Sequence, residues 1–307
     1  MPPAVTVVGS LNLDVTVEVA RLPGRGETVV GTRTTTGPGG KGANQASAAA
    51  ALAAGYPRIG GIAMVGRVGD DDAGRISTGD LTARGVDVSG IQVTPGVTTG
   101  TATVAVEPGG ENLIVVAPGA NAALTVDDVL IGAVREAAVL LAGLEVPLET
   151  VTAAARAANG LVVVNPAPPP IAGLPPPLLA AVDVLVPNEW ELRQLGGAPP
   201  AEGPAPLGRL TEQARSLGIP VVVVTIGSRG ALVVPRDGEP THVPAPAVAT
   251  VDSAGAGDCF CGALAVALSA GSPLVEAVRF AVEAAARSTT VPGARVARTA
   301  HRPGTCV

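Results

Sequence analysis

The amino-acid sequence predicts an α/β fold with a doubly wound, mostly parallel sheet, helices on both faces of that sheet, and a small second β-sheet beside it. Short continuous apolar runs alternate with helical segments along most of the 307 residues, and this alternation is typical of a parallel sheet. Two separate pairs of segments instead alternate apolar with polar residues, which indicates strands with one face in water. We expect a single domain, 1–307, with the small sheet built from about 15–36 and 97–117.

The composition limits the classes of partner. The chain is 47% hydrophobic but has only one Trp, one Tyr and two Phe, so it lacks the aromatic platforms of single-stranded nucleic-acid binders. A net charge of −6 argues against any nucleic-acid partner, because such binding depends on clustered Lys and Arg. Two histidines and three scattered cysteines do not suggest a zinc site. With no signal-peptide pattern and no apolar stretch of membrane-spanning length, we expect a cytoplasmic protein with reduced thiols and no membrane partner.

The first buried run, at 5–8, is followed by a turn that delivers Asn12 and Asp14 to the carboxyl end of a strand. Ligands of open α/β sheets bind at such ends. Asp14 is therefore a candidate acceptor for substrate hydroxyls. A solvated aspartate in a turn is the alternative interpretation.

The strands with one wet face are expected at 15–19 and 27–32, and again at 101–107 and 112–117. Turns containing Pro and Gly separate the members of each pair. Four such strands could form the small sheet beside the main one. That sheet could cover an active site or pair with another subunit.

A glycine-rich stretch at 37–42 precedes an Ala-dominated helix that we expect over 47–54. It resembles a phosphate loop, but G-x-x-x-x-G-K-[ST] is absent because Gly42 follows Lys41. We expect a loop that brings its backbone and the side chains of Lys41 and Asn44 to a small polar ligand. A flexible connector is the alternative, although a connector has no need of the lysine and the asparagine.

Apolar and helical segments alternate from residue 61 onward. The proline-rich segments 166–177 and 199–206 interrupt the pattern, and we expect them to be surface loops. Buried strands are expected at 62–65, 138–141, 161–164, 182–186 and 221–224, and helices at 70–84, 125–135, 148–158, 189–195 and 207–217.

Polar residues follow several of these strands, and a parallel sheet would place them along one edge. Such a rim could hold a nucleotide and its metal, although capping or turn formation explains any one residue taken alone. The rim comprises Glu145, Asn165, Asn188, Glu189, Glu191, Thr225, Gly227, Ser228 and Gly230.

The stretch 250–260, which opens a helix running to about Ala270, suits phosphate chemistry. Gly255 and Gly257 let the backbone approach an anion closely, and the first N–H groups of a helix have no partner inside it. Asp258 lies at the helix start, where it could accept a proton from a substrate hydroxyl. The alternative is a tight turn into a packed helix, with Asp258 as a partner of the helix dipole.

Seven motifs resemble, in order, those of the ribokinases, which belong to the PfkB family of carbohydrate kinases: GSLNLD (9–14), GGKGANQA (39–46), GANAAL (119–124), NPAP (165–168), PNE (187–189), TIGSRG (225–230) and DSAGAGDCF (252–260). The similarity covers nearly the whole chain. It implies a ribokinase-like fold with a small β-sheet lid, and transfer of the γ-phosphoryl group of ATP to the 5-hydroxyl of D-ribose. It also implies Mg²⁺ with ATP and K⁺ as an activating cation.

The resemblance implies roles for individual residues. Asp258 would be the general base, and the backbone of Gly255, Ala256 and Gly257 the anion hole. The sugar-binding positions would be Asn12, Asp14, Gly39, Gly40, Lys41, Asn44, Glu145 and Asp258. The nucleotide-binding positions would be Asn188, Thr225, Gly227, Ser228, Gly230 and Gly257, with Glu191 near the magnesium. The monovalent cation would be held by Asp252, Ala254, Ser288, Val291, Gly293 and Ala297.

The leading hypothesis is an ATP-dependent sugar kinase with D-ribose as acceptor, forming a homodimer through the small sheet. A kinase of the same family for another small acceptor, such as fructose, 2-keto-3-deoxygluconate or a nucleoside, is the first alternative. A non-catalytic sugar-binding or regulatory protein of the same fold is the second alternative. The intact motif around Asp258 argues against it. An NAD-linked oxidoreductase would need G-x-G-x-x-G after the first strand, and this sequence lacks it there.

Overall fold

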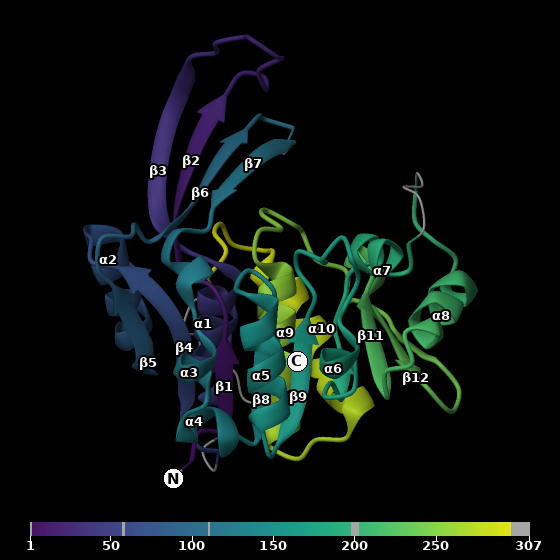
Figure 1. Cartoon of the computed structure of the whole chain (residues 1–307). Coiled ribbons are helices and arrows are strands. Elements are labelled where there is room, and N and C mark those ends of the chain that lie inside the picture. Colours follow the sequence, from purple (N-terminus) through teal and green to yellow (C-terminus); the bar gives the residue numbers. More distant parts are fainter. Residues whose placement is uncertain (1, 57–58, 110, 198–202, 296–307) are drawn as a thin grey trace.

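In the computed structural model, residues 2–56, 59–109, 111–197 and 203–295 are described. They form the predicted α/β fold, in which a nine-stranded sheet carries helices on both faces and a separate four-stranded sheet projects from one end (Figure 1). None of the helices in these ranges combines the length and the apolar character that crossing a membrane requires.

The nine-stranded sheet has the order β13-β12-β11-β10-β9-β8-β1-β4-β5. Every neighbouring pair from β11 to β5 is parallel, whereas β12 and β13 are added antiparallel at one edge. The strands are β1 (Val5–Val8), β4 (Ile62–Gly69), β5 (Val86–Thr94), β8 (Val139–Gly143), β9 (Leu161–Asn165), β10 (Val184–Leu185), β11 (Val221–Thr225), β12 (Ala231–Pro235) and β13 (Thr241–Val243).

The four-stranded sheet consists of β2 (Asn12–Val19), β3 (Gly31–Gly39), β6 (Gly100–Val106) and β7 (Asn112–Ala117), in the order β3-β2-β6-β7. Two segments far apart in the sequence therefore combine as expected. Two details of the prediction were wrong. Asn12 and Asp14 lie on β2 rather than in a turn, and the strand expected at 27–32 begins only at Gly31 and continues to Gly39.

The helices are α1 (Lys41–Ala53), α2 (Asp72–Ala83), α3 (Val126–Val129), α4 (Gly132–Arg135), α5 (Leu148–Ala157), α6 (Pro176–Leu179), α7 (Glu189–Leu195), α8 (Leu207–Ser216), α9 (Ala256–Ser269) and α10 (Leu274–Ser288), with 3₁₀ turns η1 (Gly119–Ala123) and η2 (Gly227–Arg229). Several expectations need correction. Lys41 and Asn44 lie on the first turn of α1 rather than in a loop. The helix expected over 125–135 is two short ones, and α6 begins inside a segment expected to be a loop.

The core explains why the central strands are continuously apolar. Val5 and Val7 of β1 pack into the hydrophobic cluster on the face that carries α1, α9 and α10, whereas Val8 packs into the cluster on the opposite face. Leu140 and Leu141 of β8 divide between the same two clusters. Because successive side chains point to opposite faces and both faces are covered by helices, nearly every position is apolar. The exception in β1 is Thr6, whose buried hydroxyl donates a hydrogen bond to the carbonyl of Ala133.

The start of α1 lies directly against the end of β1. A Cβ added to Gly42 would lie 2.7 Å from the backbone C of Gly9 and from the backbone N of Ser10. The N–H of Ala43 also donates to the carbonyl of Ser10. A side chain at position 42 would therefore push the first turn of α1 away from the carboxyl end of β1.

We predict that Gly42→Ala lowers the free energy of unfolding by about 1–3 kcal/mol, because the added methyl group meets backbone atoms that cannot turn aside. Gly79→Ala is the matched control, since Gly79 also lies inside a helix but has nothing within 4 Å of an added Cβ. That substitution is expected to stabilise the protein by about 0.5–1 kcal/mol. Denaturant unfolding measures both, and equal effects would contradict the close approach.

Candidate active site

The first turns of α1 and α9 meet at the carboxyl end of the nine-stranded sheet. The chain leaves β1 there, enters β2 of the small sheet, and returns through β3 into α1. The two helices pack against one another. The residues predicted to bind the sugar and to act in catalysis lie at this junction.

Asp258 is the third residue of α9 and is only 7% exposed. Its Oδ2 accepts a hydrogen bond of 3.1 Å from Asn44 Nδ2, and its Oδ1 accepts one of 3.2 Å from Gln45 Nε2. The helix begins after Gly255, which has a left-handed φ of 71° that favours glycine. The structure thus joins Asp258 to the predicted Asn44 across 214 residues of sequence.

Burial raises the pKa of the Asp258 carboxyl to about 6. The positive charge of Lys41 and the hydrogen bonds from Asn44 and Gln45 oppose that rise, whereas the nearby charge of Glu145 adds to it. The group is therefore ionised at neutral pH yet remains more basic than an ordinary aspartate. Such a carboxylate suits proton transfer near pH 7.

Lys41 is the cation at the centre of this group of carboxylates. Burial alone would lower its pKa, but the charges of Asp258, Glu145 and Glu191 raise it overall, so the ammonium stays charged. Glu145 is fixed at the start of α1, where it accepts hydrogen bonds from the backbone N–H of Lys41 and from Ser10 Oγ. A carboxylate at a helix N-terminus is favourably placed with respect to the helix dipole.

Asp14 reaches the same junction from β2. Burial, reinforced by the charge of Glu145, raises its pKa to about 6, against the opposing charges of Arg295 and Lys41. Its Oδ1 is buried and has no hydrogen-bond partner in the structure, which leaves an acceptor for a ligand hydroxyl. Asn12 is also buried, but its Oδ1 accepts a hydrogen bond from Asn121 Nδ2.

Gln45 and Arg295 contact these groups but were not predicted as site residues, and Asn165 was predicted only as part of the polar rim. Gln45 is fully buried, and its Nε2 bridges Asp258 to Asn165 Oδ1. Arg295 donates to Asn44 Oδ1 from the loop after α10. Gln45 lies inside a motif and Asn165 follows a strand, so the sequence placed both near the site. No pattern in the sequence pointed to Arg295.

The residues predicted on the nucleotide side lie along the same edge of the sheet, and some of them bond to one another. The side chain of Asn188 accepts from the N–H of Glu191, and Glu191 Oε2 accepts from the N–H of Asn188, which caps α7. Asn188 pairs with Thr225, the last residue of β11. Gly227 and Ser228 follow in the turn η2, where Ser228 is exposed, and Gly230 comes directly after that turn.

The predicted cation ligands come from two segments that contact each other. Asp252 accepts hydrogen bonds from the N–H groups of Ala254 and Gly293, both shorter than 3.0 Å. Ser288 is the last residue of α10, and Val291 is exposed. Ala297 lies outside the described residues. Within the described ranges, no three His, Cys, Asp or Glu side chains cluster so as to hold a metal ion.

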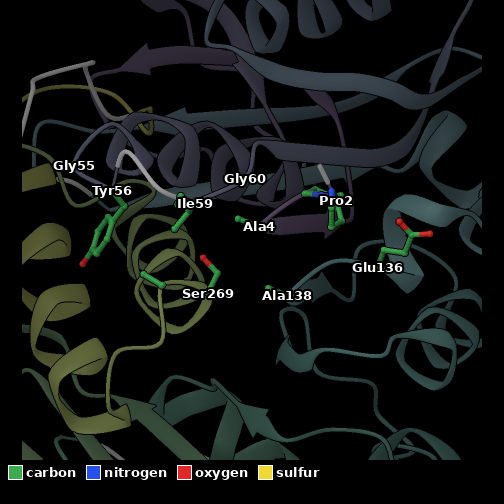
Figure 2. Close-up of a pocket in the computed structure, with 11 residues that line it drawn as sticks. Pro2, Ala4, Gly55, Tyr56, Ile59, Gly60, Glu136, Ala138 and Ser269 are labelled. Carbon is green, nitrogen blue, oxygen red and sulfur yellow. The ribbon is translucent and has the colours of Figure 1, made fainter.

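A cavity of about 550 Å³ lies at the other end of the sheet (Figure 2). Its lining includes Ala4 and Ala138, which directly precede β1 and β8. Tyr56 and Glu136 lie at its two ends and do not converge on a common point (Figure 2). The cavity is therefore separated from the site by the full length of the strands.

We predict that Asp14→Asn raises the thermal stability of the protein at pH 7.5. The folded-state pKa of about 6 exceeds the unfolded value of about 4, so the stability contributed by this group falls as pH rises between the two values, and the charged form is unfavourable above them. A difference of this size corresponds to at most about 3 kcal/mol. We expect about 1 kcal/mol, or a few degrees in Tm.

The gain should be smaller at pH 5, where wild-type Asp14 is largely protonated when folded. Asp237→Asn is the control, because the side chain of Asp237 is 89% exposed and its replacement should change stability by less than about 0.5 kcal/mol. If Asp14→Asn destabilises the protein at pH 7.5, the carboxylate is not under electrostatic strain.

The chain is similar to several known proteins over nearly its whole length. A ribokinase from Haemophilus influenzae is 34% identical over 302 residues, covering 96% of this chain and 95% of that protein. A deoxyribokinase from Salmonella typhimurium is 34% identical over 297 residues, covering 94% and 93%. The solved structure of Arabidopsis thaliana ribokinase complexed with ribose and ATP has a TM-score of 0.83 at 34% identity, covering 96% and 95%. Residues 3–300 match the pfkB family carbohydrate kinases, and the chain belongs to that family.

Proposed function

We propose that the protein transfers the γ-phosphoryl group of ATP to the 5-hydroxyl of D-ribose, giving D-ribose 5-phosphate and ADP. The observation that carries this proposal is the buried carboxylate of Asp258 at the start of α9, held by amide donors from the first turn of α1 and placed near Lys41. The complex of the Arabidopsis thaliana relative with ribose and ATP supports the choice of ligands.

Asp258 is proposed as the general base. A carboxylate has about four acceptor positions, and the amides of Asn44 and Gln45 use two of them. The remaining positions are free to accept the hydroxyl proton of the sugar. As the hydroxyl oxygen of the sugar attacks, its proton passes to Asp258 and a new bond to the γ-phosphorus forms. The bond between the γ-phosphorus and the oxygen that bridges it to the β-phosphorus breaks, which releases ADP.

The start of α9 is proposed to stabilise the charge on the phosphoryl group. Its first N–H groups and the helix dipole favour an anion there. The N–H of Ala256 already donates to the carbonyl of Ser253, at 3.2 Å. Gly255 and Gly257 therefore supply the principal backbone donors that we assign to the anion hole, with Ala256 contributing when its contact with Ser253 opens.

Asp14, Asn12, Gly39, Gly40, Lys41, Asn44 and Glu145 are proposed to bind the sugar. The orphaned Oδ1 of Asp14 fits a hydroxyl donor. Lys41 is surrounded by carboxylates, so it can neutralise their charge when the anionic nucleotide approaches. Together these groups orient the acceptor, and orientation supplies much of the rate in phosphoryl transfer.

Mg²⁺ would accompany ATP, where it neutralises charge on the phosphates. Glu191 fits this position as a single buried carboxylate near enough to Lys41 and Asp258 for their charges to act on it. Mg²⁺ is commonly held by one or two carboxylates together with substrate phosphates. A monovalent cation, K⁺, is proposed beside the anion hole at Asp252, Ala254, Ser288, Val291, Gly293 and Ala297. The hydrogen bond from the N–H of Gly293 to Asp252 brings the two segments that carry these residues together.

The four-stranded sheet is proposed to act as a lid that excludes water and as the contact between two subunits of a homodimer. Every residue of β7 is exposed, although Leu113, Ile114, Val115 and Val116 are all apolar. An edge strand of this kind is prone to pair with another chain. A partner sheet would bury these side chains while leaving the site at the base of β2 accessible.

A panel of acceptors tests the proposed reaction. ADP release is measured with ATP and D-ribose, 2-deoxyribose, fructose, 2-keto-3-deoxygluconate or adenosine, each with and without K⁺. We expect D-ribose to give the highest kcat/KM, with K⁺ increasing turnover. A higher kcat/KM for another sugar would overturn the choice of D-ribose as acceptor but not the proposed kinase activity. Absence of acceptor-dependent ADP release would favour a non-catalytic sugar-binding protein.

In the same assay, Asp258→Asn is expected to lower kcat by about a hundredfold or more, because the general base is lost. Asp183→Asn is the matched control. Asp183 accepts a hydrogen bond from the N–H of Val162 at the opposite end of the sheet, so turnover should stay close to that of the wild type. Normal turnover by Asp258→Asn would reject its role as base.

A further inference from the structure

Arg295 carries a buried positive charge into the acceptor side of the site. It lies in the loop after α10, and its side chain is only 7% exposed. Its Nε donates to Asn44 Oδ1 at 3.2 Å, and its Nη2 donates to the carbonyl of Gly39 at 3.3 Å. Its Nη1 forms an ion pair with Asp80 of α2, and Asp80 also accepts from Arg84. One guanidinium thus joins α1, α2 and the end of β3.

The contact with Asn44 fixes which way that amide faces. A guanidinium has only donors, so the oxygen of the Asn44 amide must face Arg295. The amide nitrogen then faces Asp258, to which it donates. Arg295 therefore sets the orientation of the group that holds the general base, although it does not contact Asp258 in the structure.

The contact with Gly39 holds Arg295 against the end of the four-stranded sheet that lies nearest the nine-stranded sheet. Gly39 is the last residue of β3 and pairs with Asn12, while Asp14 pairs with Gly37 on the same strand. Arg295 is also close enough to Asp14 for its charge to lower the pKa of that carboxyl. Arg295 is therefore hydrogen-bonded to the end of the β2–β3 pair that carries Asp14, at Gly39.

The loop that carries Arg295 also borders the start of α9. The N–H of Gly293 donates to Asp252, and a Cβ added to Gly255 would lie 2.4 Å from the carbonyl oxygen of Ala294. Residues 293–295 therefore run from the turn that opens α9 to the acceptor side. The planar fork of arginine suits three partners in different directions, which a lysine ammonium on its flexible stem does not match.

We propose that Arg295 is a positioning residue for the acceptor, which acts through Asn44 and through the end of β3 and links these groups to the loop beside the start of α9. The inference rests on the proposed function in one respect, namely that the acceptor binds beside Asp258. Burying an arginine with one shared carboxylate is poor evidence of a purely stabilising role. Two of its three partners, Asn44 and Gly39, are instead predicted sugar-binding residues.

Arg295→Gln and Arg295→Lys test the proposal, with Arg67→Gln as the matched control. Arg67 forms a partly buried, bidentate pair with Asp128, at 2.7 and 2.9 Å, and touches none of the site residues. We expect Arg295→Gln to raise KM for the acceptor at least tenfold while KM for ATP changes less than threefold. Arg295→Lys should lie between wild type and Arg295→Gln. Arg67→Gln should lower stability without separating the two KM values.

Hydrogen exchange of the free proteins gives a readout that needs no substrate. Arg295→Gln should speed exchange in peptides covering 37–46, and Arg67→Gln should not. If D-ribose is a poor acceptor, the KM comparison is made with whichever acceptor the panel selects, and the exchange result stands even without turnover. Unchanged exchange in 37–46 overturns the proposal, as does a parallel rise of both KM values.

Discussion

The structure depends on one buried contact, in which amides from the first turn of α1 hold the carboxylate of Asp258 at the first turn of α9. Helix α1 supplies the amides and helix α9 the carboxylate, so the contact needs both helices. The close approach of Gly42 to the end of β1 sets the position of α1, and the left-handed Gly255 sets the start of α9. The parallel sheet brings both turns to one edge, and the proposed chemistry follows from that meeting.

The electrostatics of the site follow from the same contact. Asp14, Glu145, Glu191 and Asp258 surround Lys41, so that one ammonium is shared by several carboxylates. Burial makes Asp14 and Asp258 more basic than they would be in water. This charge is unfavourable for folding. In the proposed reaction it would keep a basic carboxylate and an open acceptor beside a helix start that attracts anions.

Much of this arrangement could be predicted from the sequence, because the responsible signals are local. The apolar runs of the central strands predict burial on both faces, and the glycines before Asp258 predict a helix start. The start of α1 was missed because glycines on both sides of Lys41 resemble a loop. Strand β5 was missed because its residues are only partly buried, so no continuous apolar run marks it. Arg295 reaches Asn44 across 251 residues, and no local pattern encodes such a contact.

The dependence of kcat/KM on pH, measured between pH 5 and 8 with the preferred acceptor, tests the central claim most directly. Because the proposed base must be ionised, and because burial raises its pKa to about 6, kcat/KM should be level above pH 7 and fall below about pH 6. A profile that stays level down to pH 5 would contradict the account.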